Sequence, residues 1–159
     1  MKQKLQEYAL IAEIVGGIAI VTSLLFVGLQ INQNHEMMRA QTRNDISMAL
    51  TPILSNLTNN QDLVDLLFAA NEGKHLSDAE MYRIYTHTEL IFRYWENAHY
   101  QYRQNLYDES EFSRHRDAMK FVIADIPFYV KFVCESRNLY SEPFMIFIDD
   151  LLPNGSCLE

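Results

Sequence analysis

One segment near the amino terminus limits what this chain can fold into. Residues 10–31 read LIAEIVGGIAIVTSLLFVGLQI, and from Ile14 to His35 no residue carries a formal charge over 22 positions. About 20 apolar residues in a helix, at about 1.5 Å each, cross the roughly 30 Å hydrocarbon layer of a bilayer. Glu13 lies near the start, where a carboxylate can reach the headgroups. We therefore expect a transmembrane helix over about residues 10–31.

Two other interpretations of this segment are a signal peptide and a buried core helix. A signal peptide needs small residues at a cleavage site after the apolar run, whereas this run continues as FVGLQ. A core helix of a small domain normally has a polar stripe, and residues 14–29 offer only Thr22 and Ser23. A retained membrane helix fits better than either.

Small residues recur on one face of this segment, with a polar residue at its exit: Ala12, Gly16, Ala19, Ser23 and Gln30. Small residues let membrane helices approach closely, and glutamine can bond across the interface. The pattern predicts a homo-oligomer formed through this seam. The alternative is that membrane helices are simply rich in glycine and alanine.

Charge divides the chain in two. The net charge of the 159 residues is −8, and all of it lies in residues 35–159, because residues 1–34 hold two bases and two acids. A negative domain disfavours direct binding to duplex nucleic acid. We expect residues 1–34 to hold a juxtamembrane segment and the membrane helix, residues 35–153 a soluble helical bundle, and residues 154–159 a tail.

Hydrophobic periodicity beyond the span is helical throughout, which predicts an all-α fold: an N-terminal transmembrane helix that continues into a small helical bundle. Ser77 and Glu80 form a capping box that opens the longest soluble helix. The expected helices are 32–58, with Pro52 as a kink or boundary, 61–71 with a stop at Gly73, 77 to about 106, 108 to before Pro127, 128–136, and 141–152.

A polar cluster is predicted on the long helix. Glu89 and Arg93 are four residues apart, Arg93 and Glu96 three apart, and Asn97 follows. A carboxylate–guanidinium pair partly buried between helices would fix how those helices meet.

The alternative interpretation of this region is a ligand pocket. Arg93 or Arg103 would bind a small anionic, nucleotide-like molecule while Tyr94, Trp95 or Tyr100 stacks on it.

Catalytic and metal motifs are weak. Glu-x-x-His occurs at Glu96–His99 and at Glu72–His75, but the second straddles Gly73, and a di-iron bundle needs two such pairs on helices. No nucleophile elbow or phosphate-binding loop occurs in the sequence. We expect no catalytic residue, no metal and no cofactor, and hence no enzyme.

Orientation in the membrane depends on few residues. Lys2 and Lys4 precede the span while Arg39 and Arg43 follow it, so the positive-inside rule is close to a tie. The two cysteines have no metal-like spacing, and an unpaired-looking Cys134 in a helix favours a reducing compartment. The sequence thus predicts a membrane protein with a cytoplasmic soluble domain.

Three stretches carry a resemblance: LIAEIVGGIAIVTSLLFVGLQINQN, FRYWENAHYQYRQNLYDESEF and SEPFMIFIDDLL. They resemble a family of small bacterial membrane proteins that pair one N-terminal transmembrane helix with a helical domain. The resemblance implies that architecture in a bacterial inner membrane, and no reaction. Asn105 stands where the family is expected often to carry glycine, which bears on the local turn.

Two functions are compatible with these features. The first is a membrane-anchored, oligomeric helical scaffold or adaptor that meets a protein partner at the bilayer. The alternative is a signal-gated membrane effector whose soluble domain binds a small anionic ligand at a subunit interface.

Overall fold

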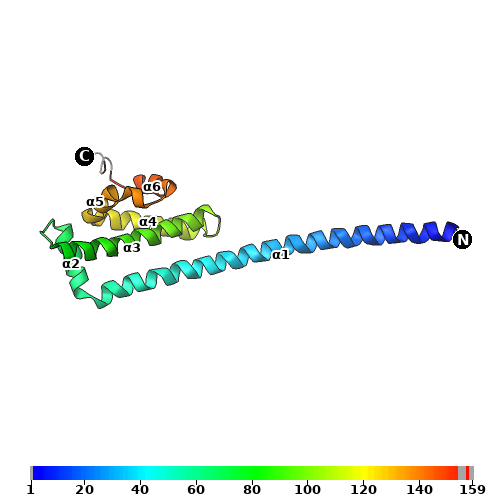
Figure 1. Cartoon of the computed structure of the whole chain (residues 1–159), viewed down its shortest axis with the longest axis horizontal. Helices are drawn as coiled ribbons and strands as arrows, with labels where there is room; N and C mark the ends of the chain where they lie inside the picture. Colours follow the sequence, from blue (N-terminus) through cyan, green and yellow to red (C-terminus); the bar gives the residue numbers. More distant parts are fainter. Residues whose placement is uncertain (1, 154–156, 158–159) are drawn as a thin grey trace. The chain divides into compact units, whose positions relative to one another are not determined.

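The computed structural model describes residues 2–153 and 157, and within them the fold is all-α, as predicted, with no strand. The long first helix is followed by a small helical bundle (Figure 1). The elements are α1 (Lys2–Asn59), α2 (Gln61–Asn71), α3 (Asp78–Arg103), α4 (Glu109–Asp125), α5 (Pro127–Glu135), the short 3₁₀ helix η1 (Arg137–Leu139) and α6 (Glu142–Asp149).

The chain divides into two compact units, Met1–Ala40 and Gln41–Glu159. The division falls inside α1, six residues beyond the boundary expected after residue 34. Of the expected tail, residues 154–156, 158 and 159 lie outside the described residues, whereas Cys157 is described.

The first unit is a single helical segment with exposed side chains along its described length up to Met38. Its large apolar residues, from Leu5 to Ile31, are all exposed. The hydroxyl of Thr22 donates to the Ile18 carbonyl at 2.8 Å, so this polar group needs no water. Among the described residues, α1 is the one helix long and apolar enough to cross a membrane, by length and composition.

A kink or a helix boundary was expected at Pro52. This residue lies inside α1, so the expectation of a boundary is wrong. A proline in a helix leaves the carbonyl four residues earlier, here Met48, without its usual amide partner. Both Pro52 and Met48 are exposed, so water can reach that carbonyl and the helix continues to Asn59.

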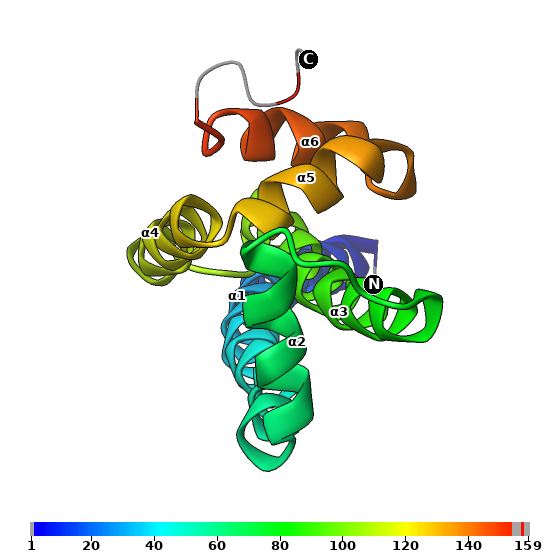
Figure 2. The same cartoon turned by 90° about the vertical axis from the view of Figure 1, so that its left-hand side faces the viewer.

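The second unit has one aromatic-rich core built around α3. α3 packs against α2, α4, α5 and α6, and α5 and α6 lie together on one side of α3 and α4 (Figures 1 and 2). Phe92 of α3 is fully buried, and its ring contacts those of Trp95, Tyr129 and Phe132. Ile46, in the part of α1 that belongs to the second unit, joins the same core.

The helix ends follow local sequence signals. The predicted capping box is present: the Ser77 amide donates to Glu80 Oε2 at 2.8 Å, and the Glu80 amide donates to Ser77 Oγ. α2 ends at Asn71 with Gly73 in the left-handed region, at φ 68°. α3 ends at Arg103, three residues before the expected end at Leu106, because Asn105 takes the same conformation, at φ 59°.

Candidate functional site

The structure brings three members of the predicted polar cluster together on α3. Arg93 Nη1 lies 3.1 Å from Glu96 Oε2, and Arg93 Nε lies 3.5 Å from Glu89 Oε1. The guanidinium also lies over the ring of Tyr140, 4.9 Å from its centre. Arg93 is therefore held between two carboxylates and an aromatic ring.

Glu96 links this cluster to α6. Its Oε1 accepts a hydrogen bond of 2.7 Å from the backbone amide of Ser141, the residue that precedes α6. Its Oε2 accepts from Arg93, so one carboxylate bonds both to its own helix and to Ser141, which lies 45 residues further along the chain. A carboxylate beside a helix amino terminus is stabilised by the helix dipole. Glu96 thus fixes where α6 begins against α3.

The remaining residues predicted here lie in different environments. Asn97 is on the exposed face, where its Oδ1 accepts from Gln101 at 3.4 Å. Trp95 is in the core, at 7% exposure, whereas Tyr100 is 54% exposed and Arg103 is the exposed last residue of α3. Arg93 and Trp95 are already engaged by the protein itself, and the anionic-ligand pocket stays a prediction.

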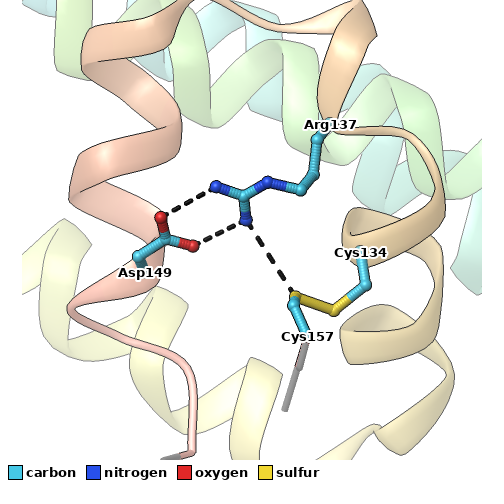
Figure 3. Close-up of a disulfide and its surroundings, with 4 residues drawn as sticks. All are labelled: Cys134, Arg137, Asp149 and Cys157. Carbon is cyan, nitrogen blue, oxygen red and sulfur yellow. Dashed lines mark hydrogen bonds and ion pairs between the residues drawn. A yellow bond between two sulfur atoms is a disulfide. The ribbon is translucent and has the colours of Figure 1, made fainter. Parts of the chain in front are cut away.

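Cys134 and Cys157 form a disulfide, which the sequence interpretation missed (Figure 3). The expectation of an unpaired Cys134 is therefore wrong. Beside the disulfide, Arg137 donates to both oxygens of Asp149, at 2.6 and 2.8 Å, and its Nη1 lies 4.0 Å from Cys157 Sγ (Figure 3). The Arg137 hydrogen bond lowers the pKa of Asp149. The two cysteines are 23 residues apart, and no sequence motif predicts a disulfide at that spacing. They meet because the chain turns back through α6.

The predicted seam residues of the first unit all lie on its exposed surface: Ala12, Gly16, Ala19, Ser23 and Gln30. A methyl group added at Gly16 or Gly17 would meet no other atom within 4 Å. Nothing in the described chain fills the space beside these glycines.

A second polar group, absent from the sequence interpretation, joins α3 to α4. His115 bonds through Nε2 to the Tyr94 hydroxyl and through Nδ1 to the Tyr107 hydroxyl, the latter at 3.2 Å. Burial lowers the pKa of His115 and raises that of Tyr94 to about 12, so all three groups are neutral at pH 7. Sequence periodicity could not reveal this group, because its members come from two helices and the loop between them.

Tyr94 and His115 also line an apolar cavity of about 370 Å³. It lies between the end of α1, α2, α3, α4 and the start of α5, and no lining residue is an acid, a lysine or an arginine. The other lining residues are Leu50, Ile53, Leu54, Leu57, Leu67, Ile91, Trp95, Ala118, Val122, Ile126 and Tyr129.

The Glu-x-x-His motif on α3 is divided between two surroundings. Glu96 faces Ser141 and Arg93, whereas the His99 ring is buried and stacks on Phe147, with centres 4.6 Å apart. Across the described residues, no three histidine, cysteine or acidic side chains are grouped as a metal site requires.

Comparisons of the chain with protein-family models, curated proteins and solved structures found no match. The bacterial family resemblance therefore stays a prediction.

Proposed function

We propose that this protein is a membrane-anchored helical scaffold or adaptor that works as a homo-oligomer. The observation that carries the proposal is the contrast between the two units. The apolar side chains of residues 10–31 are exposed, whereas residues 41–159 enclose an aromatic core of their own. An exposed apolar surface of this extent is stable in lipid and not in water.

The small-residue seam supports self-association. The open space beside Gly16 and Gly17 allows a second helix to approach the backbone closely, as small residues do in membrane helix pairs. Gln30, at the exit of the span, can add a hydrogen bond between copies.

The disulfide supports a topology opposite to the cytoplasmic one expected from the sequence. Disulfides persist in oxidising compartments and are rare in the cytosol. With Cys134 paired to Cys157, the argument for a reducing compartment is lost. We place the second unit on the oxidising side of the membrane, which in a bacterial inner membrane is the periplasmic side.

An exposed aromatic pair supports the adaptor role. Phe68 of α2 is 61% exposed and Phe121 of α4 is 67% exposed, and both line one surface pocket of about 260 Å³. Exposed aromatic side chains are enriched at protein interfaces, where they act as anchors.

Oligomer formation is tested by measuring the mass of the purified full chain in detergent. The wild type should be an oligomer, and Gly16→Leu should shift it toward monomer because the added side chain separates the backbones. Val15→Leu, which enlarges the neighbouring residue off the seam, is the matched control and should not change the mass. A monomeric wild type, or an oligomer unaffected by Gly16→Leu, contradicts self-association through the small-residue seam.

The adaptor role is tested with a photo-crosslinking amino acid at residue 121 in native membranes. A discrete protein adduct that is lost in Phe68→Ser supports a partner at this surface, with Tyr82→Ser, at an exposed tyrosine outside this pocket, as the control. The absence of any protein adduct other than a second copy of the chain contradicts the adaptor role.

A further inference from the structure

The apolar cavity beside Tyr94 has features of a built binding site. The space has a volume of about 370 Å³, and it opens to solvent beside Leu54, a lining residue that is 50% exposed. Small-molecule sites are typically about 300–1,000 Å³, mostly apolar, with a few polar groups that orient the ligand. The cavity has this size and this composition.

The lining residues restrict which ligands can bind by their charge. Its residues are aliphatic and aromatic, and their polar groups are the hydroxyls of Tyr94 and Tyr129, the indole N–H of Trp95 and the ring of His115. Moving a charged group from water into such a site without a partner is costly. A carboxylate or phosphate is therefore disfavoured, and a neutral molecule fits.

The Tyr94–His115–Tyr107 group supplies one polar contact. A neutral imidazole has one N–H donor and one acceptor nitrogen. It therefore donates to one tyrosine oxygen and accepts from the other, which leaves one of the two hydroxyls with a proton to donate elsewhere. When the imidazole proton is on Nε2, that hydroxyl belongs to Tyr94, which lines the cavity.

We propose that this cavity binds a neutral, largely hydrocarbon molecule with one hydrogen-bond acceptor, such as the carbonyl of a ketone or quinone. Tyr94 donates its hydroxyl proton to the acceptor, and the leucine and isoleucine side chains of α1 cover the hydrocarbon part. The proposal does not depend on the scaffold role, because the cavity lies wholly within the second unit.

The chain contains its own reporter, because Trp95 lines the cavity and is the one tryptophan in the sequence. The experiment measures tryptophan emission of the full chain in lipid nanodiscs, titrated with 2-nonanone, with nonane and with nonanoate. We expect a saturable change with 2-nonanone, tighter than with nonane, and no saturable change with nonanoate. Saturation by nonanoate as readily as by the ketone, or no saturation by the ketone, overturns the proposal.

Three variants in identical nanodiscs keep the partition of the probes into lipid constant. Tyr94→Phe should weaken the binding of 2-nonanone about three- to tenfold, the range of one net hydrogen bond, and leave the binding of nonane unchanged. Ala118→Leu, at the cavity lining, should weaken both probes without removing a polar group. Tyr82→Phe, at an exposed tyrosine outside the lining, should change neither. If Ala118→Leu binds both probes as the wild type does, the cavity is not the site.

Discussion

The Glu96 carboxylate accepts a hydrogen bond of 2.7 Å from the backbone amide of Ser141, and this bond joins α3 to the start of α6. Glu96→Ala removes the acceptor and should lower the free energy of unfolding by about 1–3 kcal/mol, the cost of a partly buried group left unsatisfied. Glu96→Gln keeps an acceptor and should lose less. Glu89→Ala, at the more exposed partner of Arg93, should cost under about 1 kcal/mol. Thermal unfolding followed by circular dichroism measures all three, and equal losses would contradict the special position of Glu96.

Asn105 ends α3 in a left-handed conformation, at φ 59°. For a residue with a β-carbon this conformation costs about 1–2 kcal/mol of conformational energy, and the cost is smaller for asparagine than for most residues. Asn105→Gly should therefore preserve or slightly raise the melting temperature, whereas Asn105→Val should lower it. A valine variant as stable as the wild type would show that this turn is not left-handed.

Acid should destabilise the domain through its buried histidines. His87 is 3% exposed, neither ring nitrogen has a hydrogen-bond partner in the described chain, and burial lowers its pKa below the ordinary 6.5. Below pH 6.5 the unfolded chain takes up the proton first, so stability falls as the pH drops from 6.5 toward the lower folded-state pKa. Burial lowers the pKa of His99 and of His115 as well, so both add to the loss of stability in acid.

Melting curves between pH 5 and 8 test this acid sensitivity. His87→Leu should reduce the loss of stability on acidification. At pH 7.5 the variant should be at least as stable as the wild type, because the substitution removes two ring nitrogens without hydrogen-bond partners. His75→Leu, at an exposed histidine, is the control. An acid response unchanged by His87→Leu would exclude His87 as its source.

The Cys134–Cys157 disulfide should stabilise the second unit by roughly 3 kcal/mol, because it closes a loop of 23 residues in the unfolded chain. Dithiothreitol should lower the melting temperature of the wild type to that of Cys134→Ser. It should have no effect on the variant itself. Thiols in intact cells, trapped with a maleimide polymer, should react only after reduction; reaction without reduction would contradict an oxidising location.

Sequence patterns predicted the helices well, because each helix signal lies within a few residues of the helix it defines. The capping box at Ser77 and the stop at Gly73 were identified for this reason. Pro52 misled because its effect on α1 depends on solvent reaching the Met48 carbonyl, which the sequence does not state.

The candidate site was less predictable, because its contacts join distant residues. The i, i+3 and i, i+4 spacing placed Glu89, Arg93 and Glu96 together, since that spacing is local to one helix. The disulfide, the Glu96–Ser141 bond and the His115 group depend on how helices pack, and no spacing rule covers them.

Alkaline extraction of membranes tests the central claim, that residues 10–31 anchor the chain in a bilayer. The full chain should stay in the pellet. Ile20→Lys with Leu24→Lys should release it, because each charge at the centre of a span costs about 2.5–3.5 kcal/mol. Met37→Lys with Met38→Lys, the same charges beyond the apolar run, should leave the chain in the pellet. Release of the wild-type chain by alkali would contradict a membrane-spanning anchor.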